Sequence, residues 1–121
     1  MSARWQDQVS GLKAVADYRT DMDALAPYAA LAGSSHIPVR YWLANALAFS
    51  KGKRGVETII ALLDDPSPNV VCLAFKALGR RGNRAHLRMI LDRIEASDHW
   101  YVQQYAYGAL KALGWKQKPS I

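Results

Sequence analysis

A pattern of apolar residues that recurs every 31 or 32 positions constrains this chain more than any other feature. Three nine-residue segments align without a gap, at 39–47, 70–78 and 102–110. Each segment begins with a valine, has a large residue at its fourth position and ends with an Ala-Leu pair. The large residues are Trp42, Leu73 and Tyr105. This spacing places the repeated positions on one face of a helix with 3.6 residues per turn, so we predict three equivalent helices that bury this face in a core.

A second helical pattern follows the first in each unit. A stripe of four apolar residues within 56–63 is repeated 31 positions later within 87–94. A poorer copy lies at 25–32, and an amphipathic run precedes it at 5–16. Because no segment alternates with period two, we predict an all-α chain of seven helices without a sheet. The predicted helices cover approximately residues 4–18, 23–32, 36–50, 55–64, 68–80, 84–96 and 99–114.

Residues typical of helix ends separate these segments. The predicted N-caps are Ser35, Ser67 and either Ser97 or Asp98, because their side-chain oxygens accept hydrogen bonds from free backbone N–H groups. We place four glycines at or just past helix ends, where a left-handed backbone costs glycine little. These glycines are Gly33, Gly79, Gly82 and Gly114.

Two helices per unit of 31 residues, with the pattern Val-Arg-x-x-(Ala or Leu)-x-x-Ala-Leu, resemble the HEAT-like repeat family. The short period is most similar to the variety that also occurs in phycobilisome lyases. The resemblance covers roughly residues 20–114 and implies an α-α superhelix, a solenoid of about three and a half helix pairs. It implies a single domain over 1–121, with units at approximately 4–33, 34–65, 66–97 and an incomplete 98–116.

The chain departs from the family at the arginine that follows each valine. In the family this arginine usually pairs with an aspartate in the turn between units. It is present here as Arg40, whereas Val71 and Gln103 replace it in the next two units. Aspartates remain in the turns at Asp64, Asp65 and Asp98. We therefore expect an interrupted ladder of Asp–Arg pairs.

The composition is that of a basic globular protein. Half of the residues are apolar and 21% are charged, which argues against a disordered chain. Lys and Arg number 16 against 10 Asp and Glu, and this excess suggests an anionic partner such as nucleic acid, an anionic surface or an acidic protein. The longest apolar stretch, 41–49, is too short for a membrane span. The start around Trp5 has no apolar leader, and the single Cys72 fits a reducing cytoplasm.

A first candidate site is a cluster of cations in the loop inside each unit. Because stacked units bring equivalent loops together, these cations should line one edge of the solenoid, which we call the basic loop edge. Its residues are Lys51, Lys53, Arg54, Arg80, Arg81 and Arg84, with Lys116 and Lys118 in the matching place after the last helix. This edge is either an anion-binding surface or an ordinary solvated edge, since cations are also favoured near helix C-termini.

A second candidate site is the off-core surface of the second helices, which line the concave side in the HEAT-like architecture. The candidate residues of this mixed groove are Glu57, His86, Arg88, Met89 and Arg93. A peptide groove and an ordinary solvated face are both open interpretations.

A third candidate site is the C-terminal end, where the last first-type helix has no second helix to accompany it. Aromatic and apolar residues beyond its expected core positions are Trp100, Tyr101, Tyr107, Leu113 and Trp115. They either bind another protein or a second copy, or they fold back as an improvised cap.

The remaining polar residues do not assemble into a reactive site. His36, His86 and His99 lie in different units without the spacing of metal ligands, and Cys72 sits among core positions. We therefore predict no metal, no cofactor and no catalytic residues. The function predicted from sequence is a non-catalytic adaptor or scaffold that binds protein. A solenoid that binds nucleic acid through the basic loop edge is the alternative, and a bilin lyase-like chaperone is a further one implied by the resemblance alone.

Overall fold

Seven α-helices and one short 3-10 helix make up the part of the chain that the computed structural model describes, residues 4–19 and 28–116. The α-helices are α1 (Trp5–Asp17), α2 (Tyr28–Ala32), α3 (Ile37–Leu47), α4 (Lys53–Leu62), α5 (Pro68–Arg81), α6 (Leu87–Ala96) and α7 (Trp100–Ala112), and the 3-10 helix η2 (Arg84–His86) precedes α6. No described residue lies in a strand, and the predicted all-α class is confirmed. The predicted helix at 23–32 compares with the structure only at 28–32, because 23–27 lie outside the described residues.

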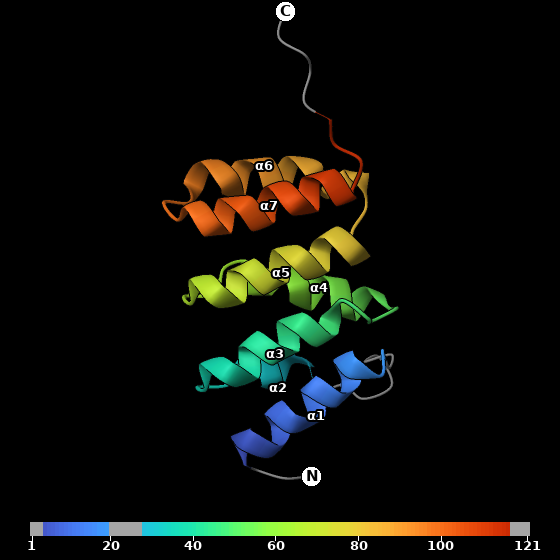
Figure 1. Cartoon of the computed structure of the whole chain (residues 1–121), viewed down its shortest axis with the longest axis vertical. Helices are drawn as coiled ribbons and strands as arrows, with labels where there is room; N and C mark the ends of the chain where they lie inside the picture. The colour runs from blue at the N-terminus through green and yellow to red at the C-terminus, as the bar shows by residue number, and fades with distance from the viewer. Residues whose placement is uncertain (1–3, 20–27, 117–121) are drawn as a thin grey trace, which may run out of the picture.

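The helices form two layers, as Figure 1 shows. In the first layer α1, α3, α5 and α7 stack in chain order, and each contacts the next. The second layer consists of α2, α4 and α6, which pack against the first-layer helices from behind. The contact between α5 and α7 is the most extensive, whereas α4 and α6 meet each other little. The first layer is therefore the continuous one.

The core lies between the two layers and is built from the repeated positions. The three aligned valines are buried, and so are the leucines that end each segment. Ile59 and Ile90 meet them from the second layer, at equivalent positions 31 residues apart. Burial of each such side chain contributes ~1.5–3 kcal/mol, so the periodic stripes are the main source of the fold's stability.

The large repeated residue departs from the predicted burial in the last unit. Leu73 is buried and Trp42 is half-buried with the Lys13 ammonium 4.7 Å from its ring centroid, but Tyr105 is 42% exposed. The prediction that Tyr105 faces the core is therefore wrong. Tyr105 and Leu73 both line an open groove, so part of the tyrosine side chain is exposed there.

The turns that enter α3, α5 and α7 share one hydrogen bond that differs from the predicted side-chain capping. Of the predicted N-caps, Ser67 occupies the N-cap position, whereas Ser35, Ser97 and Asp98 do not. The N-cap residues are His36, Ser67 and His99, and none makes a side-chain capping bond. Instead, the residue two positions earlier accepts the backbone N–H of the N-cap. The acceptors are Ser34 Oγ at 3.2 Å, Asp65 Oδ1 at 2.9 Å and Ser97 Oγ at 3.2 Å. These acceptors occupy the same repeat position, so a short polar residue is needed there in every unit.

Two glycines illustrate different structural requirements. Gly114 follows α7 with a φ of 94°, the left-handed conformation predicted for a glycine at a helix end. Gly79, by contrast, lies within the last turn of α5 and does not have the positive φ expected of a glycine that ends a helix. A Cβ at Gly79 would come within 3.0 Å of the Ala109 Cα and 3.3 Å of the Ala112 Cβ. Glycine at 79 therefore permits the close approach of α5 and α7.

We predict that Gly79→Val destabilises the protein because its branched side chain has no room between α5 and α7. Gly108→Val is the matched control, since Gly108 is also helical but a Cβ there meets nothing within 4 Å. In urea unfolding, Gly79→Val should lower the free energy of unfolding by about 1–3 kcal/mol more than Gly108→Val. Equal unfolding midpoints for the two variants would contradict the close approach.

Candidate functional site

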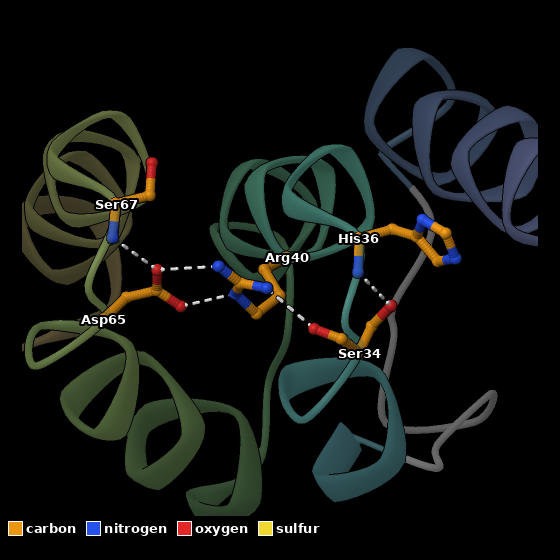
Figure 2. Close-up of polar contacts among 5 residues, drawn as sticks. All are labelled: Ser34, His36, Arg40, Asp65 and Ser67. Atoms are coloured by element: carbon orange, nitrogen blue, oxygen red, sulfur yellow. Dashed lines mark hydrogen bonds and ion pairs between the residues drawn. The ribbon is translucent and has the colours of Figure 1, made fainter.

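Arg40 links two consecutive units through a buried ion pair, drawn in Figure 2. Its Nε lies 2.7 Å from Asp65 Oδ2 and its Nη2 lies 3.3 Å from Asp65 Oδ1. Its Nη1 donates to the Ser34 carbonyl oxygen at 2.7 Å. The side chains of Arg40 and Asp65 are 11% and 4% exposed. Because Asp65 also accepts the Ser67 N–H, this one pair fixes the turns that precede both α3 and α5.

Between the next two units, both residues of the equivalent pair are replaced by uncharged ones. Val71 occupies the repeat position of Arg40, and the position of Asp65 is taken by Ser97. Gln103, at the arginine position of the last unit, keeps half of the arrangement, because its Nε2 donates to the Ser97 carbonyl oxygen at 2.9 Å. Asp64 pairs instead with Arg93 of α6. The expected interruption of the ladder is thus seen, and no unpaired buried charge is left at position 71.

The residues of the basic loop edge lie in and beside the loops that follow α3, α5 and α7 (right side of Figure 1). Lys53 and Arg54 begin α4, Arg80 and Arg81 end α5, and Arg84 begins η2. The Arg80 guanidinium stands 4.8 Å from the Phe49 ring centroid, which brings the end of α5 against the first of these loops. A Cβ at Gly114 would be 3.1 Å from Arg84 Nη1, so the loop after α5 also meets the end of α7. Arg81 is half-buried and the other described members are exposed, while Lys118 lies outside the described residues.

Most of the candidates on the second helices are engaged by the fold itself. His86 Nδ1 accepts the Asn83 N–H at 3.0 Å and so caps η2. Arg93 pairs with Asp64, and the Arg88 Nε lies 3.3 Å from the Asp92 Oδ1 within α6. Met89 is half-buried against the core and Glu57 is exposed. The structure does not bring these five residues together around one cavity that it describes.

The C-terminal candidates divide into two groups. Trp100 and Tyr107 are 67% and 44% exposed and lie seven residues apart on α7, which places them on one flank of that helix. Leu113 is buried and offers no surface, while Tyr101 and Trp115 are half-buried against the core. The Trp115 N–H donates to the Leu110 carbonyl oxygen at 2.9 Å, so the chain folds back at this point. We call the side of α7 that bears Trp100 and Tyr107 the α7 flank.

An open groove on the first layer was not found from the sequence. It has a volume of about 690 Å³ and lies over α5, between α3 and α7. Its lining includes Phe49, Leu73, Lys76, Ala77, Arg80, Tyr105, Gly108 and Ala112. We call it the first-layer groove. The signal that could have revealed it is a cluster of small residues on α7, next to larger ones at equivalent positions of α3 and α5.

A smaller cavity of about 380 Å³ lies at the opposite edge, between the turns that enter α5 and α7. Val71 and Ser97 line it, and so do Asp98 and His99. The cavity therefore lies where an Arg–Asp pair equivalent to Arg40–Asp65 would stand if Val71 and Ser97 were arginine and aspartate.

Reactive groups are few in the part of the chain that the structure describes. Cys72 is buried, and this burial raises the pKa of its thiol, which disfavours the nucleophilic thiolate. No cluster of three or more His, Cys, Asp or Glu among residues 4–19 and 28–116 is placed to bind a metal ion. None of the described helices has both the length and the apolar character that crossing a membrane requires.

Stacked helix pairs with a repeated core define a helical-repeat protein. A family model described as HEAT repeats matches residues 13–115, which is most of the chain. The chain therefore belongs to the HEAT-repeat family. Comparison with curated proteins and with solved structures gave no match.

We predict that the buried pair can be exchanged for the residues of the next unit. Arg40→Val alone leaves the Asp65 carboxylate buried without its partner and should cost about 3–5 kcal/mol of stability. The double variant Arg40→Val, Asp65→Ser copies Val71 and Ser97 and should recover most of this loss. Denaturant unfolding of the two single variants and the double variant measures the coupling. Additive losses would show that Arg40 and Asp65 do not act as a pair.

Proposed function

We propose that this protein is a non-catalytic protein-binding module, an adaptor or scaffold. HEAT repeats are commonly protein-interaction modules and are generally not enzymes. The partly buried polar side chains of Arg40, Asp65 and Gln103 make hydrogen bonds that hold the turns between units together. The surfaces that remain accessible to a partner are the exposed aromatic residues of α7 and the exposed cations of the basic loop edge.

The α7 flank is the observation that carries this proposal. Tyr107 occupies the repeat position of Ala44 and Phe75. Those two residues are 0% and 1% exposed because the next first-layer helix covers them, whereas Tyr107 is 44% exposed. The α7 flank thus carries a stacking face that no described helix covers. Exposed Trp and Tyr are the residues that contribute most to protein interfaces, so a partner protein or a second copy fits this face.

We predict that a photo-crosslinking amino acid at Tyr107 captures a partner of defined mass in an extract of the native cells. The control places the same amino acid at Tyr18, an aromatic residue that is 83% exposed at the end of α1. Adducts should form from position 107 and not from position 18, and Trp100→Ala should reduce them because it removes the neighbouring aromatic contact. Identical adducts from both positions, or none from position 107, would count against the α7 flank.

Nucleic-acid binding is a second candidate function, which the adjacency of the three basic loops favours. Arg80 reaches the loop after α3, and Arg84 reaches the end of α7. Cations from three units therefore lie along one edge, as an extended phosphate backbone requires.

If this second function holds, the chain should bind a labelled DNA duplex at low ionic strength, and salt should weaken the binding steeply. Lys53→Glu with Arg54→Glu should lower the affinity by at least about tenfold, because both cations are exposed on this edge. Fluorescence anisotropy measures both effects. Lack of binding to duplex and single-stranded nucleic acid at low salt would exclude this function.

A further inference from the structure

The first-layer groove has the dimensions of a short helix-binding site. Leu73, Ala77 and Arg80 line it from α5, and Tyr105, Gly108 and Ala112 line it from α7. Each of these sets runs from position i to i+7 of its helix, which is a rise of about 10 Å at about 1.5 Å per residue. This length matches two turns of a bound helix with apolar side chains at i, i+4 and i+7. The Phe49 and Tyr105 rings supply large apolar contacts for them.

The charge around this groove is entirely positive. Helices α3, α5 and α7 contain no Asp or Glu, whereas α4, α6 and the turns before α5 and α7 hold six. The charged residues in the groove lining are Lys76 and Arg80. Neither makes an ion pair with a described residue, while Arg40, Arg88 and Arg93 all have carboxylate partners. The groove therefore offers two unneutralised cations beside an apolar surface, which complements an acidic and amphipathic ligand.

Gly108 keeps this groove open at a cost to the helix. A glycine in a helix interior destabilises by roughly 0.5–1 kcal/mol relative to alanine. Gly79 repays that cost by allowing α5 and α7 to approach, but a Cβ at Gly108 would meet nothing within 4 Å. Packing therefore does not require a glycine at 108. The equivalent residues of the earlier units are Asn45 and Lys76, which have side chains. The surface at Gly108 is therefore open to a ligand side chain in the first-layer groove.

We propose that the first-layer groove docks an acidic amphipathic helix of a partner protein. Its apolar side chains lie against Phe49, Leu73 and Tyr105, and its carboxylates pair with Lys76 and Arg80. This inference rests on the proposed protein-binding function and assigns it a surface and a partner chemistry that are separate from the α7 flank.

The test uses the full chain and three labelled probes. The first is a 16-residue helical peptide (about four and a half turns) with leucines at i, i+4 and i+7 flanked by glutamates. The second has lysines in place of the glutamates, and the third is oligothymidylate. Anisotropy should show the acidic peptide binding at least about tenfold more tightly than the basic one. Lys76→Glu with Arg80→Glu should reverse this preference.

Gly108→Phe should fill the groove and weaken binding of the acidic peptide by at least about tenfold. Gly11→Phe is the matched control, because Gly11 is also helical with nothing within 4 Å of its Cβ position, and it lies on α1. It should bind like the wild type, and circular dichroism should show both variants folded. Equal affinity for the two peptides, or equal effects of the two glycine variants, would overturn the proposal. Oligothymidylate that displaces the peptide and is itself blocked by Gly108→Phe would reassign the groove to nucleic acid.

The photo-crosslinking at Tyr107 does not depend on the groove. Crosslinks there without peptide binding would leave a protein-binding module that uses the α7 flank. Peptide binding without crosslinks would support the groove and reject the α7 flank. Failure of both would reject the protein-binding function itself.

Discussion

Close packing between successive first-layer helices determines the positions of all the other features. Small residues at the contacts, above all Gly79 against Ala109, let α5 and α7 approach until an added Cβ would touch backbone. Because the first-layer helices recur at nearly the same sequence interval and each contacts the next, the loops align at one edge and the turns at the other. The basic loop edge, the ladder position and the first-layer groove are consequences of that alignment.

The fold uses its polar residues in two ways. At the turn edge, the buried charges are paired: Arg40 faces Asp65, and where the arginine becomes Val71 the opposing position becomes Ser97. A buried carboxylate without its cation would be costly, so the two positions change together. On the first layer, Lys76 and Arg80 have no such partner. This difference separates residues that hold the solenoid together from residues available to a ligand.

Sequence periodicity predicted the helices and the buried valines and leucines, because these depend on local spacing alone. The interrupted ladder was expected from the resemblance to the HEAT-like family, because Val71 and Gln103 replace the family's arginine. Three predictions failed, two of them because distances between helices decide the outcome. Tyr105 shares a repeat position with Leu73 but lines an open groove, and Gly79 serves a helix contact rather than a helix end. The predicted N-cap Ser35 lies one residue before the observed N-cap His36, whose N–H is accepted by Ser34 Oγ. The groove itself escaped prediction because it requires side chains from three helices at known separations.

In the proposed function, the first layer rather than the second carries the ligand-binding surface. Hydroxyl-radical footprinting of the full chain, with and without the acidic peptide, tests it directly by reading side-chain exposure. Phe49 and Tyr105 line the first-layer groove, and half-buried Met89 lies on the second layer. We predict that the peptide protects Phe49 and Tyr105 and leaves Met89 unchanged. Protection of Met89 with unchanged oxidation of Tyr105 would contradict the account.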